Sequence, residues 1–106
     1  MGAEAKYYLA YVQFTNKDLA GAEESIFQLV DEYASQDFWV AKSFILLTDI
    51  YVSQDNLFQA KQTLQSIIDN YRGEDLREVA RQRLKQIVER ENAEKASMDQ
   101  TEGEDF

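Results

Sequence analysis

The chain has 106 residues and a formal net charge of −9 at neutral pH, with 44% hydrophobic and 29% charged residues, the proportions of a single folded domain. It contains no histidine, cysteine or proline, which excludes zinc sites built on His or Cys, disulfides, thiol nucleophiles and a Ser-His-Asp triad, and which fits a largely helical chain. The acidic excess disfavours nucleic acid as a partner, and no run of eighteen apolar residues is present to form a transmembrane segment.

Residues 3–33 predict two helices joined by a short polar link. The first helix is hydrophobic on nearly every side between residues 7 and 14, so it requires burial on several sides. The second helix begins after Asp18, whose side chain can accept hydrogen bonds from free amides of the first turn. Its apolar stripe has helical spacing and consists of Leu19, Ala22, Ile26, Leu29, Val30 and Tyr33.

A second helix pair is predicted over residues 38–71. Its first helix is again apolar on several sides, and we interpret Trp39 as a buried wedge at the junction with the first pair. Asn56 is placed to cap its second helix. The stripe of that helix consists of Leu57, Ala60, Leu64, Ile67, Ile68 and Tyr71.

A fifth helix is expected over residues 75–93, with a polar outer face that closes the stack. Its apolar face consists of Leu76, Ala80, Leu84, Ile87 and Val88. The bases Arg77, Arg81 and Lys85 recur on another face, which we interpret as solvated and paired with acids such as Glu78. Periodicity fades after residue 93, so residues 94–106 are expected to form a disordered acidic tail.

The two helix pairs are related by an internal repeat. Aligning residues 3–33 with 41–71, an offset of 38 positions, gives six identities, and several further positions exchange one apolar residue for another. The identities are Ala3/Ala41, Leu9/Leu47, Leu19/Leu57, Ala22/Ala60, Asp31/Asp69 and Tyr33/Tyr71. Apolar type therefore recurs at a fixed period, which is typical of stacked supersecondary units.

The second unit resembles the tetratricopeptide repeat. It supplies the pattern Phe44-x-x-Leu47-Thr48-x-x-Tyr51 followed by Ala60-x-x-x-Leu64. The first unit resembles a more degenerate copy, Lys6-x-x-Leu9-Ala10-x-x-Gln13 and then Ala22-x-x-x-Ile26, with Lys6 and Gln13 at aromatic positions. The resemblance covers residues 3–88 and implies an all-α solenoid of antiparallel helix pairs, here five helices forming a C-terminal fragment of a longer repeat protein.

The same resemblance implies a concave groove lined by the first helix of each unit. Carried over by position, the groove residues are Tyr7, Tyr11, Phe14 and Thr15 in the first unit and Lys42, Ile45, Asp49, Val52 and Ser53 in the second. For Tyr7, Tyr11 and Phe14, a place in the groove and a place in the core are weighed equally, whereas Tyr8, Leu9 and Val12 are expected in the core. Asp49, the acid on an otherwise apolar helix, is explained by a salt bridge to Lys42 or by exposure to the groove.

These patterns favour a non-catalytic scaffold that binds a protein or peptide in the groove. The alternative is a self-assembly module, in which the uncovered aromatic first helix pairs with that of a second copy to form a homodimer. Catalysis is not expected, because the acids lie in loops, on solvent faces or in the tail, and none is flanked by residues that would bury it beside another. We therefore predict no catalytic residue, no cofactor and no metal site.

Overall fold

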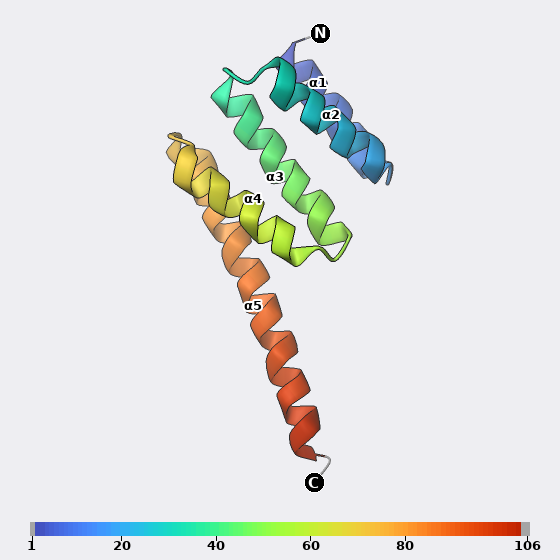
Figure 1. Ribbon diagram of the computed structural model, residues 1–106, viewed down its shortest axis with the longest axis vertical. Coiled ribbons are helices and arrows are strands. Elements are labelled where there is room, and N and C mark those ends of the chain that lie inside the picture. Colours follow the sequence, from blue (N-terminus) through green and yellow to red (C-terminus); the bar gives the residue numbers. More distant parts are fainter. Residues whose placement is uncertain (1, 105–106) are drawn as a thin grey trace.

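The computed structural model describes residues 2–104, with side chains described through residue 97. Its regular structure in that range is entirely α-helical, which confirms the predicted all-α class and the five helices. The helices are α1 (Ala3–Thr15), α2 (Leu19–Glu32), α3 (Asp37–Ser53), α4 (Leu57–Asn70) and α5 (Glu74–Glu104). Figure 1 shows α1 and α2 as a pair at one end, α3 beside them, and α4 packed along the first part of α5.

The links within the two pairs have the same geometry at equivalent positions. Lys17 and Asp55 hold left-handed backbone conformations, with φ of 65° and 57°, and follow the ends of α1 and α3. The next residue caps the following helix in each case: Asp18 accepts a hydrogen bond from the amide of Gly21, and Asn56 accepts one from the amide of Gln59. The two predicted N-caps are therefore confirmed, and the links keep the offset of 38 positions.

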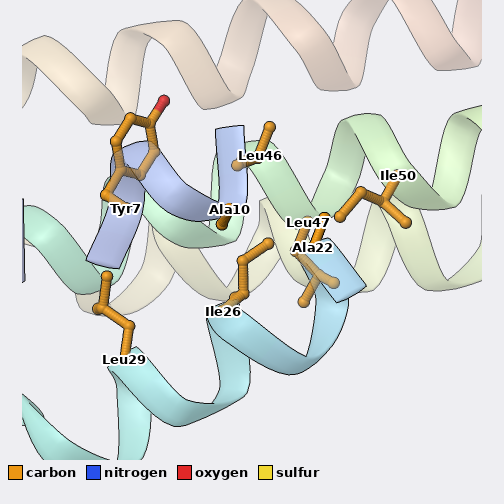
Figure 2. Close-up of a cluster of buried hydrophobic side chains, with 8 residues drawn as sticks. All are labelled: Tyr7, Ala10, Ala22, Ile26, Leu29, Leu46, Leu47 and Ile50. Carbon is orange, nitrogen blue, oxygen red and sulfur yellow. The ribbon is translucent and has the colours of Figure 1, made fainter. Parts of the chain in front are cut away.

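The first pair packs on α3 through one hydrophobic cluster, which Figure 2 shows. Ala10 of α1 and Ala22 of α2 are fully buried in it, as expected where two helices cross closely. The cluster consists of Tyr7, Ala10, Ala22, Ile26, Leu29, Leu46, Leu47 and Ile50. Trp39 packs against this cluster from α3, at the junction of the two units, but it is only partly buried and not the buried wedge that the sequence predicts.

A second cluster joins α3 to α4 and α5, so that α3 is buried on two sides. It consists of Ala41, Ile45, Ala60, Leu64, Ile67, Ala80 and Ile87. Phe44 and Tyr51 of α3 are partly buried and pack against both clusters. Burial on two sides explains why the sequence of α3 is apolar nearly all round rather than along a single stripe.

The closing helix is longer than predicted. α5 continues as a helix through Glu104, past the expected end at residue 93 and through most of the segment predicted to be a disordered tail. Its last part extends away from the other helices (Figure 1). The physical reason is composition: residues 91–98 are rich in Ala, Glu, Lys and Met, which are good helix formers, and no proline interrupts them. Residues 105–106 lie outside the described part of the chain.

The prediction that Tyr8, Leu9 and Val12 lie in the core is wrong. All three are exposed on α1, with 49%, 39% and 51% of their surface accessible. The apolar character of α1 predicted burial on several sides, but α2 and α3 cover only the side that carries Ala3, Tyr7 and Ala10. Phe14 also packs partly against this side, whereas Tyr8, Leu9, Tyr11 and Val12 stay exposed to solvent.

Candidate partner-binding groove

Tyr7 lies at the edge of the first hydrophobic cluster, with its ring in the core and its hydroxyl directed out of it (Figure 2). Its ring is 9% exposed and belongs to the first hydrophobic cluster, while its hydroxyl points away from the other side chains of that cluster (Figure 2). Burial raises the pKa of Tyr7 above its ordinary value; the nearby Tyr11, Tyr8 and Asp49 also raise it, and Arg83 lowers it. The hydroxyl therefore stays protonated at neutral pH and lies within electrostatic reach of α3 and α5.

Lys42 of α3 holds its ammonium group against three aromatic rings. The Nζ atom lies 5.2 Å from the ring centroid of Tyr7 and 5.5 Å from those of Phe38 and Trp39. Within residues 2–97 no carboxylate forms an ion pair with it. The expected salt bridge between Lys42 and Asp49 is therefore wrong, because the ring faces attract the ammonium and Asp49 has another partner.

The partner of Asp49 is Arg83 of α5, whose guanidinium donates a hydrogen bond to its carboxylate. Burial raises the pKa of Asp49 above its ordinary value, although Arg83 opposes that shift through its charge and its hydrogen bond. Burial thus removes part of the hydration of the ionised carboxylate, which makes its charged form less favourable than it is in water.

A hollow of about 170 Å³ lies beside this ion pair, between α3 and α5. Its polar and charged lining includes Asp49, Arg83 and Arg90, and Arg90 also contacts Asp55 at 3.3 Å. Val52 and Ile87 give the hollow apolar walls. We call the surface that runs from Tyr7 and Tyr11 through Lys42, Asp49 and Val52 to Arg83 and Arg90 the groove.

The predicted groove residues differ in exposure. Tyr11 is 47% exposed, with its ring stacked on Tyr7 at a centroid distance of 6.4 Å. Lys42, Asp49, Val52 and Phe14 are half-buried, and Phe14 packs against the first cluster. Ile45, at 8% exposed, belongs to the second cluster. Tyr11 is thus the most exposed of these residues, and Tyr7 and Ile45 are the two buried ones.

Arg83 and Arg90 were not predicted from the sequence. The sequence instead draws attention to Arg77, Arg81 and Lys85. The solvated pairing expected of them is confirmed for Arg81, which contacts Glu74 at 2.7 Å and Glu78 at 3.0 Å. The available signal was the spacing of Arg83 and Arg90 around apolar Ile87, at i, i+4 and i+7 on one helix face. Only the packing of α5 against α3 shows that this face meets Asp49.

The described residues offer neither a metal site nor a membrane span. No group of three or more acids that could hold a metal ion occurs among them. None of the helices within the described range is both long enough and apolar enough to cross a membrane.

Comparison with known proteins gives one match. A family model described as a tetratricopeptide repeat-like domain matches residues 2–105. Neither the curated proteins nor the solved structures gave a significant match to the chain. The matched range spans both helix pairs and the closing helix.

Proposed function

Because the chain belongs to the tetratricopeptide repeat-like domain family, we propose that it is a non-catalytic scaffold that binds a polypeptide segment along the groove. Helical repeats of this kind typically mediate protein interactions. One observation carries the proposal. The exposed ring of Tyr11 and the ammonium of Lys42, which has no carboxylate partner among residues 2–97, both lie against Tyr7, and Tyr7 lies within electrostatic reach of Asp49 and Arg83.

The chemistry of the groove favours particular side chains in the partner. Tyr11 offers an exposed ring stacked on a buried one, so an apolar or aromatic side chain can pack on it with little loss of conformational freedom. Lys42 is held in place by its three rings, and a carboxylate of the partner would supply the missing counter-charge. A segment that presents both an apolar and an acidic side chain therefore fits this surface best.

The pair Asp49–Arg83 restricts where that carboxylate can bind. Arg83 already donates to Asp49, so an incoming acid near Arg83 would face a neighbouring negative charge. Lys42 lies two helical turns from Asp49 on α3, about 10 Å along the helix axis at 1.5 Å per residue. No carboxylate among residues 2–97 forms an ion pair with it. The acidic side chain is therefore expected at Lys42, and Val52 with the adjoining hollow is expected to receive apolar surface.

The test is a selection of binders from a displayed library of random peptides. Peptides bound by the full chain are measured against the variants Tyr11→Ala and Lys42→Met, and affinity is expected to fall about tenfold or more for each. The matched control is Phe27→Ala on α2, because Phe27 and Tyr11 are equally exposed, at 47%. The selected peptides are expected to carry an acidic residue. Once that residue is replaced by its amide, Lys42→Met is expected to weaken binding no further.

Two results would contradict the proposal. In one, the selected peptides bind equally well to Tyr11→Ala and Lys42→Met. In the other, Phe27→Ala weakens binding more than Tyr11→Ala, which would place the binding surface on α2 instead of the groove.

A further inference from the structure

One face of α1 is apolar and exposed. Tyr8, Leu9 and Val12 have 49%, 39% and 51% of their surface accessible, and Ala5 one turn earlier is exposed as well. The four positions follow i, i+3, i+4 and i+7 spacing, which is the pattern of a helix face that packs against another helix. We call these four residues the end face.

The internal repeat shows what covers such a face. Adding the offset of 38 positions to the end face gives Ser43, Leu46, Leu47 and Ile50 of α3. These four side chains are at most 3% exposed. Leu46, Leu47 and Ile50 lie in the first hydrophobic cluster, where α1 and α2 cover them. Equivalent faces of α1 and α3 are therefore bare in one unit and fully covered in the other.

The equivalence does not rest on the apolar residues alone. The left-handed residues Lys17 and Asp55 differ by the same offset, and so do the helix caps Asp18 and Asn56. Because the links repeat in conformation, α1 and α3 have the same register within their units. The end face of α1 thus corresponds residue for residue to the face of α3 that packs on α1 and α2.

We propose that the end face is a docking surface for a further helix–turn–helix unit, joined ahead of Ala3 in the same register and presenting to α1 the apolar stripe that α2 presents to α3. That stripe includes Ala22, Ile26 and Leu29, which are all fully buried. The end face is continuous with this established interface. The ring of Tyr8 lies edge-on to Tyr7 at 5.3 Å and to Trp39 at 6.4 Å, so an added unit would extend the existing cluster.

A second copy of the chain, the self-assembly alternative, is a poorer occupant. The stripes of α2 and α4 already pack within their own molecule, in the clusters that include α3 and α5. A second copy would have to pair its own end face with this one. Two chains of net charge −9 also repel each other, which opposes a dimer held by one short helix face.

The experiment duplicates residues 3–40 directly ahead of Ala3 in the full chain, which restores the spacing that precedes Ala41. Docking is expected to slow hydrogen exchange at the amides of the original α1 by about tenfold or more. It is also expected to raise the midpoint of thermal unfolding by at least about 4 °C. The matched control carries Leu9→Gln and Val12→Gln in the original copy. These changes are expected to cancel the gain in the extended chain and to leave the midpoint of the unextended chain unchanged, because both side chains are exposed there.

Three results would overturn the proposal. The extended chain could gain helix while exchange at α1 stays as fast as before. The double Gln variant could lower the unfolding midpoint of the unextended chain, which would show that the end face supports the fold by itself. Sedimentation of the unextended chain could reveal a dimer that Leu9→Gln abolishes and Phe58→Gln, which changes another exposed apolar side chain on α4, does not. Such a dimer would make a second copy the occupant. Either of the last two results would overturn the proposal even if the extended chain fails to fold.

Discussion

The guanidinium of Arg83 donates a hydrogen bond to the carboxylate of Asp49, and this contact ties the middle of α3 to α5 on the groove side. Burial nevertheless raises the pKa of Asp49 above its ordinary value of 3.8, with the charge and hydrogen bond of Arg83 acting in the opposite direction. The folded state therefore disfavours the ionised carboxylate even though it is paired. A partly buried carboxylate that does not favour folding, and that lies on a proposed binding surface, is suited to a functional rather than a stabilising role.

The substitution Asp49→Asn is expected to stabilise the protein at neutral pH and to lose that advantage in acid. Because the pKa of Asp49 is higher in the folded than in the unfolded chain, protonation of its carboxyl favours folding. This contribution to the free energy of unfolding is fully present below the unfolded-state pKa and is lost as the pH rises through the folded-state pKa. The amide of the variant is neutral at every pH, so the two proteins converge below about pH 4, near the ordinary pKa of Asp. Urea unfolding of both proteins across this range measures the difference.

The control for this prediction is Asp55→Asn, because Asp55 is an exposed partner of Arg90 on the same side of the molecule. Exposed ion pairs contribute little, so its effect is expected to stay within about 1 kcal/mol. If Asp49→Asn destabilises the protein at neutral pH, the ion pair outweighs the burial of the carboxylate and the expected direction is wrong.

Leu47 and Leu9 are the same residue type at equivalent positions in the two units, but they are 3% and 39% exposed. Leu47→Ala is expected to lower the free energy of unfolding by about 2–5 kcal/mol, because it leaves a cavity in the first cluster. Leu9→Ala is expected to cost less than about 1 kcal/mol, because little apolar surface is re-exposed. Chemical denaturation of the two variants compares them directly, and equal costs would refute the assigned difference in burial.

The features that the sequence predicts correctly are local ones. The caps Asp18 and Asn56, the repeat offset and the five helices follow from local chemistry and periodicity, and the structure confirms them. The caps and the helices depend on residues within a few positions of each other, and the repeat offset is found by comparing the sequence with itself, so one sequence is enough to predict all three.

The errors concern contacts between distant helices. Periodicity shows that Leu9 is suited to burial but not whether a neighbouring helix covers it, and the structure leaves it exposed. The sequence suggests Lys42 as the partner of Asp49 because both lie on α3, whereas the partner, Arg83, comes from α5. Arg83 and Arg90 are not predicted from the sequence for the same reason, because the packing angle of α5 against α3 cannot be inferred from either helix alone.

Ser43 is a buried polar residue whose hydroxyl has no hydrogen-bond partner among the described residues. Ser43→Ala is expected to raise the free energy of unfolding by about 1 kcal/mol, because it removes an unsatisfied group and introduces a better helix former. The matched control is Ser53→Ala on the same helix, where the hydroxyl is exposed and donates to the carbonyl of Asp49 at 3.0 Å. A gain at residue 53 equal to that at residue 43 would show that helix propensity alone is responsible.

Lys17 follows the end of α1 with φ of 65°, a left-handed conformation in which its Cβ lies too close to the following carbonyl oxygen. Lys17→Gly removes that contact, worth about 1–2 kcal/mol, but it also increases the conformational freedom of the unfolded chain, which costs about 0.5–1 kcal/mol. The expected net result is a gain of about 0.5–1 kcal/mol in the free energy of unfolding. Lys17→Ala keeps the Cβ and is expected to give no gain. Thermal and urea unfolding of both variants measure the difference, and a less stable Gly variant would mean that the left-handed residue in this link is not strained.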